Sequence, residues 1–201
     1  MSMQFKYLIS ILVICILGIS IIPIPVKSNG GLPTSLRLYA RIIETFDYKW
    51  AVMSNEDKEK IHNESLWIAR VLLSEDTRRK PWIMMASIVK NRVDTEHRRK
   101  TNVWSVIHDK RQFSAVTGES WNRYKKLTLD SNNSHFNESY DIARNVLVMG
   151  VPNRYEGITH AYYPSTMTGV YGYNKSYPTW DTPNNPMDMR DGVDGWVYGA
   201  P

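Results

Sequence analysis

Apolar residues recur at helical spacing along the chain as far as residue 150. A first helix is predicted after the start signal Pro33-Thr34-Ser35, and its inward positions are Leu36, Tyr39, Ile43 and Phe46. A second is predicted after the capping-box pattern Ser54-x-x-Asp57. Its segment from Leu66 to Leu73 is apolar on nearly every side, which is typical of a buried helix, and it runs directly into Ser74-Glu75.

Three further helices are expected after Glu75. The first begins at Pro81, and its inward positions are Trp82, Met85, Ala86, Val89 and Val93. A short helix covers Val103 to His108, and a longer one runs from Ser134 to a left-handed cap at Gly150. Beyond Gly150 the helical period ends, and Gly157 to Tyr163 is predicted to be a strand. The pattern therefore predicts a mainly helical α+β fold.

The first thirty residues have a different character. Residues 7–26 carry no charge and are rich in Ile, Leu and Val, while Lys6 precedes them. Pro23 and Pro25 end the helix near Ile22, so about 16 residues, or about 24 Å, are helical. No Ala-x-Ala cleavage site follows. We interpret this segment as a transmembrane or signal-anchor helix that leaves the rest of the chain outside the membrane.

This pattern divides the chain into three parts. Residues 1–28 are the membrane anchor or signal segment, 29–59 a helical linker, and 60–201 the functional domain. The formal charge is +5, and basic residues gather at 78–80, 97–100, 110–111 and 123–126. Such patches attract polyanions but do not choose among nucleic acid, anionic lipid and acidic wall polymers. Twelve Tyr and seven Trp against four Phe favour half-wet grooves for sugar rings, or else a core filled with polar-edged rings.

Glu75 is the main candidate for chemistry. A carboxyl group held against apolar walls has its charged form disfavoured, so its pKa rises and it can donate a proton near neutral pH. Cleavage of a glycosidic bond needs such an acid to protonate the leaving oxygen. The single cysteine excludes a disulfide framework, the five histidines lack zinc-ligand spacing, and Asp188, Asp191 and Asp194 lack calcium-loop spacing. We expect no metal and no cofactor.

An ordered set of segments resembles the SleB-like cell-wall hydrolases, the spore cortex-lytic family. The segments are Leu66-Trp67-Ile68-Ala69-Arg70-Val71-Leu72-Leu73-Ser74-Glu75, Ala86-Ser87-Ile88-Val89-Lys90-Asn91-Arg92-Val93, Gln112-Phe113-Ser114, Ala143 to Gly150, and Thr159-His160-Ala161-Tyr162-Tyr163-Pro164. They occur in the family's order between Leu66 and Thr168. The sequence departs from the family directly after Glu75, where Asp76-Thr77-Arg78-Arg79 replaces the usual small residues and second acid.

The resemblance implies a lysozyme-like fold, a peptidoglycan substrate and Glu75 as catalytic acid. It also implies lytic transglycosylase chemistry, in which the 6-hydroxyl of muramic acid replaces water and no second carboxylate nucleophile is needed. We expect Gln112 to bind an N-acetyl group and Phe113 to pack beneath a sugar, with Ser114 in the same motif; the alternative is a loop pinned to the core. The remaining candidates for contact with substrate are Tyr162 and Tyr163 beside Glu75, His160, and Asn91 as a helix-end or groove hydrogen-bonder.

Other functions stay open at this point. Bacterial and phage origins are both open, and an anchored wall-cutting domain would suit a phage lysin. An inactive peptidoglycan-binding or virion structural protein would keep the fold without the activity, and an N-acetylmuramoyl-L-alanine amidase would release stem peptides instead. A basic membrane protein that binds nucleic acid would show steep salt dependence, although no nucleic-acid partner is expected.

Overall fold

The computed structural model describes residues 34–109, 113–162, 188–191 and 196–200. The chain forms two compact units, Met1–Lys58 and Glu59–Pro201. The apolar run at residues 7–26, predicted to be a membrane helix, lies outside the described residues. Within the described ranges, no helix combines the length and the apolar character needed to span a membrane.

In the first unit, α2 (Thr34–Val52) begins where Pro33-Thr34-Ser35 predicts a helix start. The rings of Phe46 and Trp50, one turn apart, stack with centroids 6.3 Å apart. The capping contact after this helix is confirmed, because the backbone N–H of Asp57 donates to Ser54 Oγ at 3.0 Å. The Ser54 hydroxyl in turn donates to the Asp57 carboxylate at 2.7 Å. This contact starts the long helix that carries Glu75.

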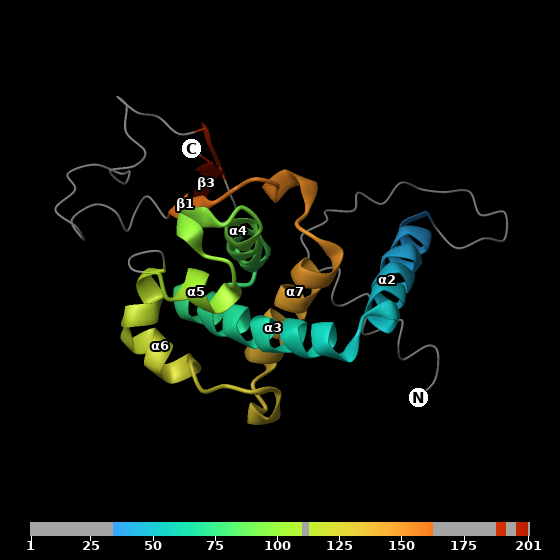
Figure 1. Cartoon of the computed structure of the whole chain (residues 1–201), viewed down its shortest axis with the longest axis horizontal. Coiled ribbons are helices and arrows are strands. Elements are labelled where there is room, and N and C mark those ends of the chain that lie inside the picture. Colours follow the sequence, from blue (N-terminus) through green and yellow to red (C-terminus); the bar gives the residue numbers. More distant parts are fainter. Residues whose placement is uncertain (1–33, 110–112, 163–187, 192–195, 201) are drawn as a thin grey trace. The chain divides into compact units, whose positions relative to one another are not determined.

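The helices that follow are shown in Figure 1. They are α3 (Asn55–Glu75), α4 (Trp82–Asp94), α5 (Val103–Ile107), α6 (Glu119–Tyr124) and α7 (Ser134–Met149). Four short 3₁₀ turns join them: η1 (His97–Arg99), η2 (Ser114–Thr117), η3 (Leu129–Ser131) and η4 (Asn153–Tyr155). The helices predicted between Thr34 and Gly150 are thus confirmed, whereas α6 and the 3₁₀ turns were not predicted because they are too short for a periodic pattern.

The centre of the second unit is α4. Every residue from Trp82 to Val89 is buried, and so are Asn91 and Arg92. The helix contacts α5, α7 and β1 (His160–Tyr162), and Figure 1 shows it nearly end-on with α5 and α7 around it. The prediction that only one face of this helix is buried is therefore wrong, because residues on all of its sides are buried between Trp82 and Val89. A helix surrounded in this way must bury its polar residues too, so each of them needs a hydrogen-bond partner.

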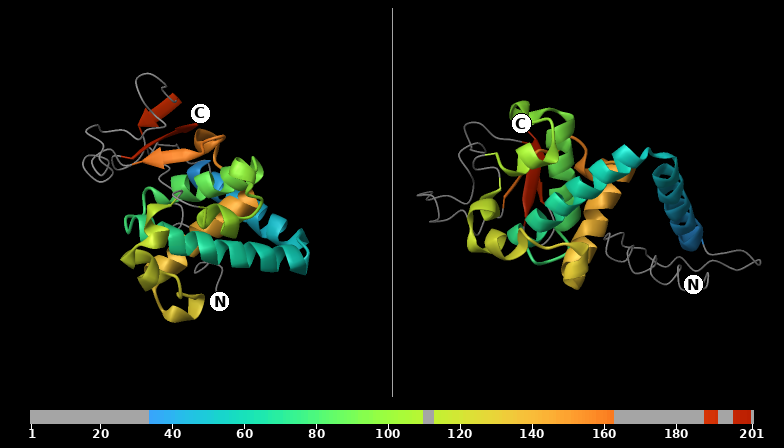
Figure 2. Two further views of the ribbon diagram at one scale, coloured as in Figure 1. Left: turned by 60° about the vertical axis from the view of Figure 1, so that its left-hand side comes forward. Right: turned by 60° about the horizontal axis from the view of Figure 1, so that its bottom comes forward.

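A small antiparallel sheet covers one side of α4. Its order is β1-β3-β2, with β2 at Asp188–Asp191 and β3 at Val197–Ala200. In the register, Ala161 pairs with Tyr198, which pairs in turn with Arg190. The left view of Figure 2 shows these strands close together. The mainly helical α+β class is confirmed, but β2 and β3 were not predicted.

Two glycines shape the chain between α7 and the sheet. Gly150 follows α7 with φ 95° and ψ 171°. The positive φ was expected, but the extended ψ takes the chain away from the helix, so the prediction of a left-handed cap is wrong in that angle. Gly157 also has a positive φ, 73°, and forms a turn. The strand predicted from Gly157 to Tyr163 therefore begins only at His160 within the described residues.

Candidate functional site around Glu75

Glu75 is the last residue of α3 and is partly buried. Its Oε1 atom accepts a hydrogen bond from the backbone N–H of Ala115 at 2.9 Å. Ala115 belongs to η2, two residues after Phe113. The fold therefore brings the end of the Glu75 helix and the segment that follows Gln112-Phe113-Ser114 into direct contact across forty residues of sequence.

The turn after Glu75 is held by Asp76. The Asp76 carbonyl accepts a hydrogen bond from the indole N–H of Trp82 at 2.6 Å. Its carboxylate accepts from Arg78 Nε at 2.9 Å and from the indole N–H of Trp196 at 3.2 Å. Burial alone would raise the pKa of Asp76, but the hydrogen bonds from Arg78 and Trp196 bring it below its usual value. An ionised Asp76 thus links the end of α3 to the segment leading into β3.

Arg92 is the buried cation of this site, and its residue surface is only 5% exposed. Its Nε–H donates to the Thr159 carbonyl at 2.7 Å, and its guanidinium carbon lies 5.2 Å from the centre of the Phe113 ring. Burial lowers the pKa of Arg92 to about 10, while the carboxylates of Asp109 and Glu75 act in the opposite direction. Arg92 therefore stays charged at neutral pH and connects α4 with the Phe113 segment and the start of β1.

Asn91 precedes Arg92 and is also buried. Its side-chain amide donates to the carbonyls of Tyr155 and Ile158, each at 2.7 Å. Both amide hydrogens are therefore used to hold the chain that leads to His160. In this structure Asn91 is a buried hydrogen-bonder near the end of α4, and its contact with substrate stays a prediction.

His160 and His97 meet edge to face beside Arg92, with ring centroids 5.4 Å apart. Burial, with the charges of Arg92 and His97, lowers the pKa of His160 to about 4. Burial and the charges of Arg92 and Arg98 also lower the pKa of His97, against the opposing effect of Asp109. Both rings are thus neutral at pH 7. His160 Nδ1 lies 2.9 Å from Thr159 Oγ1.

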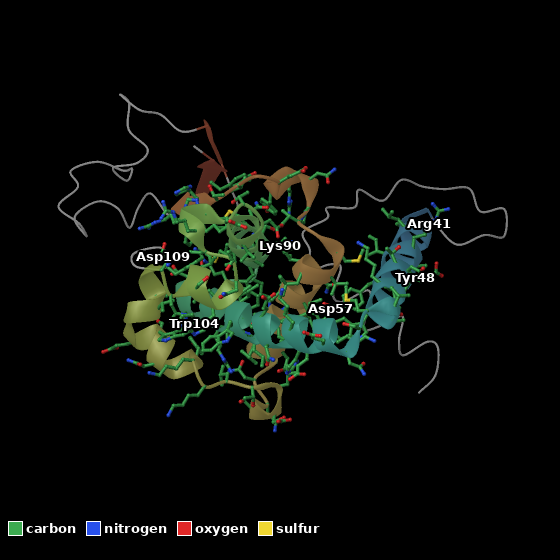
Figure 3. The ribbon with its side chains drawn as sticks, in the orientation of Figure 1. Arg41, Tyr48, Asp57, Lys90, Trp104 and Asp109 are labelled. Atoms are coloured by element: carbon green, nitrogen blue, oxygen red, sulfur yellow. The ribbon has the colours of Figure 1, made fainter. Side chains whose placement is uncertain are left out.

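The loop that carries His97 has an unusual backbone. Glu96, Arg98 and Arg99 have φ values of 49°, 55° and 62°, in the left-handed region that non-glycine residues seldom occupy. Arg98 Nε lies 3.3 Å from Asp109 Oδ2, and Asp109 is labelled in Figure 3. This ion pair ties the loop to the segment after α5.

The predicted site residues thus fall into three groups. Glu75, Phe113, Asn91 and His160 have described side chains; Phe113 lies against Arg92, and the charge of Arg92 helps to lower the pKa of His160. Ser114 and Tyr162 are placed by their backbone, in η2 and β1, while their side chains lie outside the described part of the chain. Gln112 and Tyr163 lie outside the described residues altogether.

Sequence reasoning missed Arg92, His97 and the N–H of Ala115. The polar run Lys90-Asn91-Arg92, which follows a mainly apolar segment of the same helix, was the available signal for Arg92. Ala115 gives no such signal, because any residue but proline supplies a backbone N–H. Across the described ranges, no group of three His, Cys, Asp or Glu side chains could hold a metal ion.

No protein-family model, curated protein or solved structure matches this chain. The resemblance to the SleB-like hydrolases therefore rests on the segments quoted above. The structure adds the contacts of Arg92 with Phe113 and Thr159, which join three of those segments. It also adds the hydrogen bond to Glu75 from Ala115, the residue after Gln112-Phe113-Ser114.

Proposed function

We propose that this protein is a peptidoglycan-cleaving glycosidase of the lytic transglycosylase type, with a lysozyme-like domain and Glu75 as its general acid and base. The observation that carries the proposal is the hydrogen bond from Ala115 to Glu75, which joins the acid to the Phe113 segment. Arg92 contacts the Phe113 ring and donates a hydrogen bond to the Thr159 carbonyl directly before β1. These are the segments whose order along the chain resembles the SleB-like hydrolases.

In the proposed reaction, Glu75 protonates the oxygen that joins muramic acid to the next sugar. The bond between this oxygen and the anomeric carbon breaks, and the muramic 6-hydroxyl attacks that carbon. Its proton passes to the Glu75 carboxylate, which restores the acid. The products are a new sugar hydroxyl and a 1,6-anhydro ring, and no water is consumed.

The neighbouring carboxylates favour this route over one with a second carboxylate nucleophile. Asp76 accepts hydrogen bonds from Arg78 and Trp196, and Asp109 is paired with Arg98. A nucleophilic carboxylate has to be available to the anomeric carbon. Both of these carboxylates already have partners, which favours a hydroxyl of the substrate over Asp76 or Asp109 as the nucleophile.

The proposed substrate lies outside the cytoplasm. We therefore propose that the apolar run at residues 7–26 anchors the protein in the inner membrane or exports it, with the domain facing the cell wall. A phage lysin and a bacterial wall enzyme are both consistent with this arrangement.

The test is digestion of purified peptidoglycan by the full chain, followed by mass analysis of the fragments. Anhydro ends, lighter than hydrolysed ends by one water, are expected. Glu75→Gln keeps the size of the side chain but removes the proton donor, so the rate should fall at least 10²-fold, about the lower limit for general acid–base catalysis. Circular dichroism checks that the variant is folded.

Each alternative product pattern has its own meaning. Reducing ends throughout would indicate a hydrolase, and free stem peptides an amidase. Binding to peptidoglycan without any cleavage would identify an inactive wall-binding protein. Unchanged cleavage by Glu75→Gln would show that Glu75 is not the acid.

A further inference from the structure

Four rings form a connected cluster away from Arg92, which we call the aromatic platform: Trp67 of α3, Trp104 of α5, His108 after α5, and Trp121 of α6. Trp104 and His108 stack with centroids 4.5 Å apart and planes inclined by 21°. His108 meets Trp67 and Trp121 edge to face at 5.4 and 5.7 Å, and these two indoles stack at 6.1 Å. Three helices therefore hold one rigid set of rings.

Trp104 is the exposed member of the platform. Its surface is 54% exposed, whereas Trp121 is 8% exposed, and Figure 3 places Trp104 by α5 and α6. Because His108 covers one side of the indole, the exposure falls on the remaining surface of the ring. A large apolar ring left in water costs free energy. Holding it in a fixed orientation, however, prepares it to stack on a ligand without a further loss of side-chain entropy.

Hydrogen bonds fix two members of the platform. His108 Nδ1 lies 2.9 Å from the carbonyl of Trp104. Since a carbonyl only accepts, Nδ1 is the donor in this contact. Arg70 lies over Trp67 at 4.8 Å, and its Nε and Nη2 both donate to the Leu127 carbonyl. This arrangement fixes Trp67 against the loop after α6.

The platform and Glu75 share α3. Trp67 lies eight residues before Glu75, which corresponds to about two turns and about 12 Å along the helix axis. A ligand that covers both places must be an extended molecule. A sugar polymer has this form, and each of its rings offers an apolar C–H face that matches an indole face.

We propose that the aromatic platform is a carbohydrate-binding subsite, in which Trp104 stacks on a sugar ring of a glycan strand away from the bond that is cleaved. The identity of that strand as peptidoglycan rests on the proposed function. The stacking itself does not depend on cleavage, so the two can be tested separately.

Binding is measured with the full chain carrying Glu75→Gln, which prevents turnover. The probes are a soluble hexamer of N-acetylglucosamine, followed by tryptophan fluorescence and calorimetry, and insoluble peptidoglycan in sedimentation. Adding Trp104→Ala should raise Kd about tenfold, while Trp104→Phe should stay within about threefold. Tyr48→Ala, which removes an aromatic ring that is 68% exposed on α2, is the matched control and should leave Kd unchanged.

Three outcomes would overturn the platform: no binding of either probe, equal binding with and without the Trp104 indole, or an equal loss with Tyr48→Ala. Single-stranded RNA is tested in parallel because aromatic rings also stack on bases. If Trp104→Ala weakened binding to RNA but not to the sugar probes, the platform would be overturned as well. Cleavage by the wild-type chain is scored independently. If the chain cleaves peptidoglycan but Trp104→Ala does not change binding, the proposed activity stands and the platform is refuted. If binding depends on Trp104 but no cleavage occurs, the platform stands and the proposed activity is refuted.

Discussion

Asn91 gives the sharpest test of how the site is assembled. The side chain is 6% exposed, and its two amide hydrogens bind the carbonyls of Tyr155 and Ile158 at 2.7 Å. Two perturbations separate the parts of this contact. Asn91→Ala removes both donors, while Asn91→Asp keeps the shape but places a negative carboxylate against two carbonyl oxygens.

The magnitudes follow from the number of bonds lost. Each hydrogen bond contributes about 1 kcal/mol net, and a buried carbonyl left without a partner costs about 1–3 kcal/mol more. The Tyr155 carbonyl still accepts from the backbone N–H of Ile158 at 3.3 Å, so the full penalty applies at most to the Ile158 carbonyl. Asn91→Ala should therefore lower the free energy of unfolding by about 2–5 kcal/mol. Asn91→Asp should lower the free energy of unfolding further at pH 7, because the buried carboxylate would face two carbonyl oxygens instead of a cation.

The pH dependence of Asn91→Asp tests the same contact by its sign. Next to two carbonyls and out of water, the introduced carboxyl has a folded-state pKa above its unfolded value of about 3.9. Its protonated form can donate one hydrogen bond, so the defect relative to the parent chain should shrink as the pH falls from 7 to 5. Asn91→Ala has no such group, so its defect relative to the parent should change little over that range.

The assay is urea unfolding of the full chain in a mild non-ionic detergent, followed by the circular dichroism of the helices. With a slope of about 2 kcal/mol per molar urea, a loss of 3 kcal/mol moves the midpoint by about 1.5 M. Asn63→Asp, on the exposed side of α3, is the matched control. The reasoning fails if the Asn91 variants resemble this control, or if acid does not relieve Asn91→Asp more than Asn91→Ala.

Two further predictions concern the histidine contact and the end of α7. The pKa of His160 falls from 6.5 to about 4 on folding. Its contribution to stability is therefore complete above about pH 6.5 and is lost as the pH falls towards 4. For a partly exposed ring, the stability lost amounts to about 1–2 kcal/mol after solvent screening. Urea unfolding at pH 7 and pH 4.5 should show that loss, and His160→Gln should reduce the difference. In Gly150→Ala the added Cβ has no atom within 4 Å, but φ stays at 95°. Backbone strain alone should therefore lower stability by about 1–2 kcal/mol. An unchanged urea midpoint would show that the backbone relaxes to negative φ.

Helix starts and ends were the most predictable part of the fold, since single residues mark them. Thr34, Pro81 and Gly150 each stand at or beside a helix terminus, as their backbone preferences require. The strands β2 and β3 were not predictable in the same way. Each has four residues, too few for an alternating pattern, and pairing supplied by distant segments sets their register.

The candidate site shows the same limit at the level of side chains. Glu75 was predicted to lie against apolar walls, and α3 does end in a buried apolar segment. Its described neighbours also include the N–H of Ala115 and the charge of Arg92. A sequence does not reveal whether an arginine near a helix end is buried or solvated, because burial depends on what packs against the helix. Here β1 and the Phe113 segment provide that packing.

These contacts assign different tasks to two helices. The proposed acid is on α3, whereas α4 supplies Asn91 and Arg92, which hold the chain from Tyr155 to Thr159 and contact Phe113. A change at Glu75 removes a proton donor at a partly exposed helix end, so it can abolish chemistry while the fold remains. A change at Asn91 or Arg92 removes hydrogen bonds from the buried part of α4, so any loss of activity should be accompanied by a loss of stability. Measuring both quantities for each variant therefore separates the chemical group from the residues that position its surroundings.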